Sequence, residues 1–305
     1  MSLLYPSKAK PFLKWAGGKT QLLEQFEAFL PKDFEQKDNV TYIEPFVGGG
    51  AMLFYMLQRF QNIGNVIIND INRNLTDAYI NVKYNAEKLV DELKHIENEY
   101  LRINDYDKQK SYYLDKRSRF NDENLDSIER SALMIFLNRT CFNGLYRENS
   151  KGKFNVPFGK YVNPTICNED VIYSDSELLN RFDVRIINGD FLETEKAVDS
   201  KEDTFIYFDP PYRPLNATSS FNSYVKEEFD DRRQIDLSEL CKRLSTNEKV
   251  YWMLSNADCS AKNPDDTFFE KLYSGFHIHR VYASRSVNAN GNKRGKLTEL
   301  LISNY

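Results

Sequence analysis

The amino-acid sequence predicts an α/β fold whose sheet is mostly parallel with one reversed strand. Apolar runs of about five residues, rich in β-branched and aromatic side chains, recur along the chain, and helical patterns separate most of them. The last two runs follow each other without a helix between them, which indicates a terminal hairpin. Strands that alternate with helices build parallel sheets, and the hairpin adds the reversed strand.

The first two predicted strands lie on either side of a glycine turn. A strand at residues 40–44 leads through Pro45–Gly50 into a helix that begins at Ala51. Such a unit is typical of nucleotide binding, because glycines let a ligand approach the backbone and the helix amino terminus favours polar or anionic groups. The second strand, residues 65–69, ends in Asp70, a position suited to the ribose hydroxyls of an adenosine. The pair favours an adenosine-bearing cofactor, and an aspartate that caps the next helix is the alternative.

The remaining elements complete the sheet. One helix ends at Pro31, and two more flank the fifth strand, at about 231–244 and 261–273. The later strands are predicted at residues 184–188, 204–208, 250–254, 276–283 and 299–303. The first of these leads to Asp190 and Phe191, a second acidic strand end with a ring beside it.

Residues 71 to about 132 have a helical, polar pattern without a strand signal, which predicts an accessory subdomain inserted between strands of the sheet. The stretch at 142–161 contains the turn dipeptide Asn143-Gly144 and a second turn at 150–153, which indicates a β-hairpin or an extended loop. Aromatic residues and cations are interleaved along it. This mixture suits duplex DNA, because cations meet phosphates, arginine bonds guanine and rings wedge between bases.

The chain is organised around Asp209-Pro210-Pro211-Tyr212, which ends the strand at 204–208. Ligands bind at the carboxyl ends of strands in open α/β sheets. The two prolines restrict the backbone, so we expect the Asp209 carboxylate and the neighbouring carbonyls to point into one cleft. Two acceptors and the flat ring of Tyr212 suit a planar ligand that carries an amino group. A strand-ending turn with an exposed aspartate is the alternative.

Charge and hydropathy narrow the function classes. The 305 residues carry a net charge of −4, yet the segments 8–19, 139–160 and 280–296 hold net charges of +4, +4 and +5. If the fold brings them together they form the positive face that nucleic acid requires, and three separate solvated loops are the alternative. No apolar run of about 18 residues and no signal-peptide pattern is present, so we expect a cytoplasmic protein without membrane association.

Two further classes are disfavoured. The four cysteines lie far apart and only three histidines are present, so the sequence indicates neither a zinc site nor a disulfide framework, and we expect no metal. Gly18-Lys19-Thr20 resembles a phosphate-binding loop, but that pattern requires a glycine where Leu13 stands. A nucleotide triphosphatase is therefore disfavoured.

Six motifs resemble, in the same order, the Dam-type DNA adenine-N6 methyltransferases, a GATC-type family in the alpha group of amino-methyltransferases. They are Phe12–Lys19, Glu44–Gly50, Asn143–Arg147, Phe154–Gly159, Gly189–Phe191 and Asp209–Tyr212. The resemblance extends over nearly the whole chain, from about residue 11 to about residue 304. It implies a Rossmann-like, S-adenosylmethionine-dependent catalytic domain at 1–72 and 168–305, and an inserted helical DNA-recognition domain with a β-hairpin at 73–167.

The resemblance also implies a role for individual residues. Those expected at S-adenosylmethionine are Trp15, Ala16, Gly17 and Lys19 at its methionine part, Phe46 and Gly48 at its centre, Asp70 at its ribose, and Asp190 and Phe191 at its adenine. Those expected at double-stranded DNA are Lys14 and Arg147 at guanines, Phe142 and Leu145 as wedges at the extruded base, and Asn143, Pro157, Lys160 and Tyr161 beside them. Phe142 stands where the family often has Tyr, and Lys160 where it often has Arg, and both departures bear on flanking contacts rather than on chemistry.

The implied reaction is methyl transfer to the N6 amino group of an adenine flipped out of duplex DNA, within GATC. Asp209 accepts one amino N–H and the Pro210 carbonyl the other, Tyr212 stacks on the base, and Phe221 or Tyr224 lines the pocket. The alternatives are amino-methylation of cytosine, RNA or a protein glutamine, and a DNA-binding relic without activity. We expect a monomer, with any cognate restriction endonuclease a functional rather than a physical partner.

Overall fold

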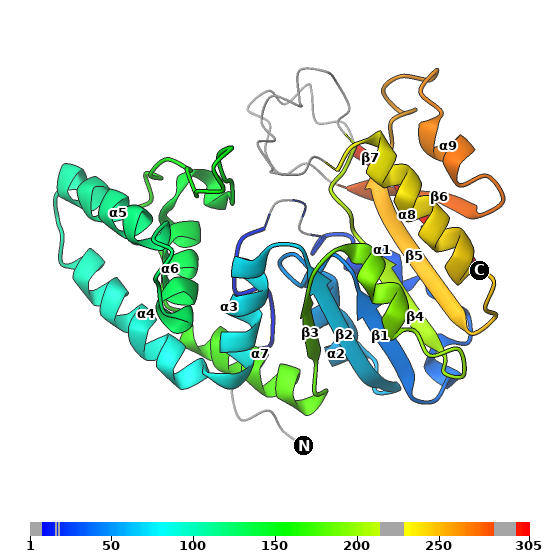
Figure 1. The fold of residues 1–305 in the computed structure, drawn as a ribbon, viewed down its shortest axis with the longest axis horizontal. Coiled ribbons are helices and arrows are strands. Elements are labelled where there is room, and N and C mark those ends of the chain that lie inside the picture. The colour runs from blue at the N-terminus through cyan, green and yellow to red at the C-terminus, as the bar shows by residue number, and fades with distance from the viewer. Residues whose placement is uncertain (1–7, 16, 18, 214–228, 284–296) are drawn as a thin grey trace.

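The computed structural model describes residues 8–15, 17, 19–213, 229–283 and 297–305. Its centre is a seven-stranded sheet in the order β3-β2-β1-β4-β5-β7-β6 (Figure 1). The strands are β1 Val40–Glu44, β2 Ile63–Asp70, β3 Arg185–Asn188, β4 Thr204–Phe208, β5 Val250–Ala257, β6 His277–Ala283 and β7 Leu297–Ser303. The pairs among β1 to β5 are parallel, and β7 pairs antiparallel with both β5 and β6, which confirms the mostly parallel sheet with one reversed strand.

The helices of the described ranges cover both faces of this sheet or pack beside its β3 edge. They are α1 Leu23–Glu27, α2 Ala51–Arg59, α3 Arg73–Tyr84, α4 Ala86–Leu101, α5 Tyr106–Phe120, α6 Ser127–Thr140, α7 Glu169–Arg181, α8 Asp231–Leu244 and α9 Phe268–Leu272, with short 3-10 turns η1 Phe34–Gln36, η2 Phe142–Gly144 and η3 Phe191–Ala197.

Strand β4 shows why the strands are continuous apolar runs. Phe205 and Tyr207 belong to one core with residues of α1, α2, α3 and α7, whereas Ile206 and Phe208 belong to a second core with residues of α8 and α9. Successive side chains of a strand point to opposite faces, so a sheet that is covered on both faces needs apolar residues at every position. Because both faces are covered, a binding site at this sheet has to lie at the strand ends.

The helices α4, α5 and α6 lie beyond α3, on the side of the molecule next to the β3 edge (Figure 1). Their buried side chains, such as Leu93, Tyr113 and Phe136, continue the core that covers one face of the sheet. Helix α3 packs against α4, α6 and α7 and also contacts β2 and β3. It is therefore the element that joins the helical block to the sheet.

Several predicted bounds need correction. The helix expected at 261–273 is only α9, because Pro264 lacks a backbone N–H and the side chains of Asn263 and Asp266 hold turns before it. The sequence analysis missed helix α7 altogether.

The segment 141–161, called the recognition loop below, doubles back but is not a regular hairpin. It contains two isolated antiparallel bridges, Cys141 with Phe158 and Glu148 with Phe154. Asn143 and Gly144 have φ values of 56° and 62°, and this left-handed turn lies between the two bridges. The sequence prediction of a β-hairpin or an extended loop is therefore met by a loop with hairpin-like pairing.

We predict that Gly50→Ala destabilises the protein by about 1–3 kcal/mol or more, because it combines backbone strain with a clash. Gly50 has a φ of +76°, and a Cβ there would lie 2.4 Å from the Tyr79 hydroxyl. Urea unfolding measures the effect. Gly275→Ala is the matched control, since its φ of +100° is also positive but a Cβ there meets no atom within 4 Å. Equal losses in the two variants would contradict the steric part of the prediction.

Candidate active site

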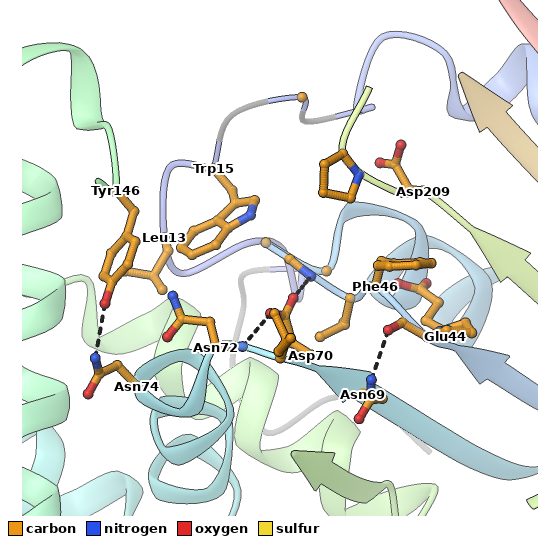
Figure 2. A pocket seen from close by; sticks show the side chains of 18 of the residues that line it. Leu13, Trp15, Glu44, Phe46, Asn69, Asp70, Asn72, Asn74, Tyr146 and Asp209 are labelled. Carbon is orange, nitrogen blue, oxygen red and sulfur yellow. Dashed lines mark hydrogen bonds between the residues drawn. The ribbon is translucent and has the colours of Figure 1, made fainter. Parts of the chain in front are cut away.

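The carboxyl ends of four neighbouring strands, β3, β2, β1 and β4, meet at one edge of the sheet. Each ends in, or is followed by, a residue that the sequence analysis singled out: Asp70 ends β2, and Asp190, Phe46 and Asp209 follow β3, β1 and β4. All four line one cavity of about 1590 Å³. Figure 2 shows Trp15, Phe46, Asp70 and Asp209 around this cavity. The topology therefore gathers groups that lie far apart in the sequence.

Asp209 lies beside a buried cation. Lys19 Nζ is 3.1 Å from Asp209 Oδ1, and the ammonium also donates to the Gly17 carbonyl at 2.8 Å. The Ser255 hydroxyl, from β5, donates to the same Oδ1 at 2.9 Å. Burial raises the pKa of Asp209 above its ordinary value, and Lys19 and Ser255 oppose that rise. The carboxylate is thus stabilised in its charged form by partners from two other parts of the chain.

Tyr212 is held on the other side of the same lysine. Its hydroxyl donates to Glu299 Oε2 of β7 at 2.7 Å, and Lys19 Nζ lies 4.3 Å from the ring centre. Lys19 Nζ is also 3.8 Å from Glu299 Oε2. Burial raises the pKa of the Tyr212 hydroxyl well above its ordinary value, so it remains a donor. The preceding carbonyl of Pro211 accepts from Gln234 at 3.1 Å, which fixes the backbone of the corner.

The Asp70 carboxylate organises the glycine turn. Its two oxygens accept the backbone N–H groups of Gly48 at 3.1 Å and of Asn72 at 2.9 Å. Burial raises the pKa of Asp70 to about 6, although both hydrogen bonds favour the charged form. Trp15 packs on the same turn, since a Cβ at Gly48 would lie 2.9 Å from the indole. The bare backbone of the turn is what allows this approach.

Three aromatic rings line the cavity at the end of β3. The ring centres of Phe46, Phe191 and Phe229 lie 5.2 to 5.7 Å apart. Asp190 accepts from the backbone N–H of Leu192 at 2.9 Å and pairs with Arg233, which also lies over the Phe191 ring. Phe229 and Arg233 were not identified from the sequence, because they lie outside every motif.

The expected DNA-contacting residues fall into two groups. Lys14 and Arg147 line the cavity, whereas Phe142, Asn143, Leu145, Pro157, Lys160 and Tyr161 lie outside its lining. Arg147 is held by the Asn155 side chain, to which its Nε donates at 2.8 Å. Phe142 is 52% exposed and Leu145 36%, which is unusual for large apolar side chains. Lys160 and Tyr161 border a separate, smaller hollow.

Some predicted residues lie outside the part of the chain that the structure describes. They are Ala16, Phe221 and Tyr224, and most of the basic segment 280–296. In the described ranges, no group of three or more His, Cys, Asp or Glu side chains is arranged to hold a metal ion. None of the helices in those ranges combines the length and the apolar character that a membrane crossing requires.

Comparison with known proteins identifies the family. The family model for D12 class N6 adenine-specific DNA methyltransferases matches residues 15–287. The chain belongs to this family. It is an adenine-specific DNA methyltransferase, which confirms the family, the enzyme class and the methyltransferase sheet expected from the six motifs.

Relatives of this D12 class enzyme match over almost their full length. The type II methyltransferase M.MjaIII of Methanocaldococcus jannaschii is 47% identical, over 98% of this chain and 100% of its own. The type II methyltransferase M1.LlaDCHI of Lactococcus lactis is 39% identical, over 100% of this chain and 99% of its own. A DNA adenine methylase of Haemophilus influenzae is 34% identical, over 96% and 93%.

The D12 class enzyme also has site residues that no motif indicated. Ser255 and Glu299 touch Asp209 and Tyr212 from β5 and β7. The signal that could have found them is position, because Ser255 lies just past the predicted end of a buried strand, and Glu299 is an acid inside one. Lys19, expected beside the cofactor, lies against the Asp209 carboxylate.

We predict that Asp70 makes the protein less stable as pH rises from about 4 to about 6. The folded pKa of about 6 exceeds the unfolded value of about 3.9, so the folded state binds more protons in that window and the free energy of unfolding falls as pH rises. Asp70→Asn removes this loss, which amounts to at most about 3 kcal/mol.

Urea unfolding at pH 4 and pH 7 tests the assignment. Asp107→Asn, at an exposed position of α5, is the control and should keep the pH dependence of the wild type. If the free energy of unfolding of Asp70→Asn fell as steeply between pH 4 and pH 7 as that of the wild type, Asp70 would not be the titrating group.

Proposed function

We propose that the protein transfers a methyl group from S-adenosylmethionine to the N6 amino group of an adenine that is flipped out of duplex DNA, within GATC. The observation that carries this proposal is the Asp209 corner: a partly buried carboxylate at the end of β4, held by Lys19 and Ser255, with the Tyr212 ring beside it. Membership of the D12 class supports N6 of adenine as the acceptor.

The residues present suit S-adenosylmethionine, which supplies an electrophilic methyl group when bound. The Asp70 carboxylate is an acceptor for the two ribose hydroxyls, and the glycine turn exposes backbone next to it. The rings of Phe46 and Phe191 offer apolar faces to an adenine. Trp15, with Ala16, Gly17 and Lys19, would border the methionine part. An acid, a glycine turn and rings in one cavity are the set that this cofactor needs.

Asp209 has one oxygen for the incoming base. Among the described residues, Lys19 and Ser255 both contact Oδ1, which leaves Oδ2 to accept an adenine N–H. The Pro210 carbonyl accepts the other N–H. As the amino nitrogen becomes tetrahedral and positive, a fixed carboxylate stabilises it more than it stabilised the flat amine, and that difference lowers the barrier. Lys19 favours the ionised form of Asp209, because its charge opposes the rise that burial gives to the pKa of that carboxyl.

The depth of the corner supports base flipping. The Asp209 carboxylate lies inside the cavity beside Lys19 and its side chain is only 23% exposed, so an adenine stacked in a duplex cannot reach it. The exposed side chains of Phe142 and Leu145, in the recognition loop, supply apolar wedges that insert between bases. Arg147 and Lys14 read guanines, and Asn143, Pro157, Lys160 and Tyr161 complete the contact. In this proposal residues 73–167 form the recognition domain, the remainder forms the catalytic domain, and the enzyme works in the cytoplasm.

We predict that Asp209→Ala and Asp209→Asn each lower the methylation rate by about 10²–10³-fold or more, while affinity for S-adenosylhomocysteine changes by less than about threefold. The reason is that the carboxylate acts on the base and not on the cofactor. Transfer of a tritiated methyl group to a GATC duplex measures the rate, and calorimetry measures the affinity. A near wild-type rate in either variant would remove Asp209 from the mechanism.

The same assay on matched substrates separates the alternatives. A GATC-free duplex, a duplex with cytosine in place of the target adenine, and an RNA of the same sequence should accept no methyl group. Methylation of any of them in preference to the GATC duplex would overturn the proposed substrate, and absence of transfer to the GATC duplex as well as to these three would indicate an inactive relic.

We predict that Arg147→Ala weakens binding by about 1–3 kcal/mol at one base pair of the site and leaves other sequences unaffected. An arginine that bonds a guanine edge carries sequence information, whereas a cation at a phosphate does not. Lys160→Ala is the matched control, and should weaken binding equally on all duplexes and reduce the salt dependence by about one ion. Fluorescence titration of duplexes with single base changes gives both quantities. Equal losses on every duplex for Arg147→Ala would make it a phosphate contact.

A further inference from the structure

Tyr146 lies between the cofactor edge and the recognition loop. Its ring stacks on Trp15, with centres 5.5 Å apart and planes 28° from parallel. On another side it packs against Phe154, whose ring centre is 5.6 Å away. Figure 2 shows Tyr146 and Trp15 facing each other above the start of α3. Neither the motifs nor the proposed chemistry gives this ring a role.

The hydroxyl of Tyr146 is also held on both sides. The Asn74 side chain, from the first turn of α3, donates to it at 2.9 Å, and the hydroxyl donates to Glu148 Oε1 at 2.5 Å. Burial and the neighbouring Glu148 raise the pKa of Tyr146, so the group remains protonated and keeps donating. The ring is therefore fixed by α3 below it, by the loop beside it and by Trp15 on its face.

The other neighbours of these two rings belong to the two binding regions. Trp15 packs on the Gly48–Gly49 turn, where a Cβ on either glycine would lie within 3.0 Å of its side chain. That turn is tied to Asp70 through the Gly48 N–H. In the other direction, the residue after Tyr146 is Arg147, the residue expected to read guanine. The stack of Trp15 on Tyr146 thus connects the glycine turn beside Asp70 to Arg147.

We propose that Tyr146 is a positioning residue that couples cofactor binding to sequence reading, a role that rests on the proposed function. A cofactor that binds against Trp15 orders the indole, and an ordered indole fixes the Tyr146 ring through the stack. The backbone that carries Arg147 is then already in place when DNA arrives, so the DNA binds with less loss of conformational entropy. By thermodynamic linkage, bound DNA must raise the affinity for the cofactor by the same factor.

The test is a thermodynamic cycle on the full-length protein. The dissociation constant of a fluorescent GATC duplex is measured with and without saturating S-adenosylhomocysteine, and the ratio of the two is the coupling factor. We expect at least about fivefold for the wild type. Tyr146→Phe keeps the stack and should stay within twofold of that factor, whereas Tyr146→Leu loses the stack and should bring it close to one. Calorimetry of S-adenosylhomocysteine with and without the duplex should give the same factors.

Controls separate coupling from loss of structure. Tyr106→Ala removes an aromatic ring from α5, on the same helical block but away from Trp15, and should keep the wild-type factor. If Tyr146 had a purely structural role, its replacement would weaken DNA binding equally with and without S-adenosylhomocysteine. The coupling factor would then stay at the wild-type value. If circular dichroism shows that the Leu variant is unfolded, Tyr146→His keeps a smaller flat ring and should give an intermediate factor.

The outcomes also distinguish this proposal from the function on which it rests. A wild-type factor of one, or a wild-type factor retained by Tyr146→Leu or Tyr146→His, overturns the coupling role even if GATC methylation is normal. A wild-type protein that binds neither S-adenosylhomocysteine nor the duplex overturns the proposed function instead.

Discussion

The buried ammonium of Lys19 is the interaction on which the candidate active site depends. It lies among the Asp209 carboxylate, the Glu299 carboxylate and the Tyr212 ring, and its side chain is only 5% exposed. Lys19 Nζ lies 3.1 Å from Asp209 Oδ1 and 3.8 Å from Glu299 Oε2, so one cation faces both carboxylates. Its charge opposes the rise that burial gives to the pKa of Asp209. Removing one partner from such a cluster leaves an uncompensated charge, which is strongly destabilising.

Helix α3 gives the rest of the molecule its relation to that site. The helix begins where β2 ends, because the Asn72 side chain caps it at the Leu75 N–H while the Asn72 backbone N–H bonds Asp70. Its first turn reaches the recognition loop through Asn74. Its buried face packs on α6 and α7. A short capped helix therefore spans the distance from the sheet edge to the helical block, and no flexible linker separates the two among the described residues.

The sequence was most informative where a local pattern determines the structure. Strands β1 and β4 have the predicted bounds, because each is an apolar run that ends at proline or at a glycine turn. The acidic strand ends and the six motifs located most of the cavity. Partners that arrive from other strands were not predictable: Ser255, Glu299 and Arg233 meet the site only through the strand order and the packing of α8. Helix α7 was missed, and α9 is shorter than its pattern, since both follow loops whose turns compete with helix formation.

The reversed strand β7 has a consequence for how the enzyme matures. It enters the sheet between β5 and β6 and delivers Glu299 to a tyrosine that lies 87 residues earlier in the chain. A contact over such a long range requires the conformational entropy of the intervening chain to be lost before it forms. A chain in which β7 has not yet been inserted lacks the acceptor for the Tyr212 hydroxyl and the second carboxylate at Lys19. Assembly of the Asp209–Tyr212 corner is therefore tied to completion of the sheet.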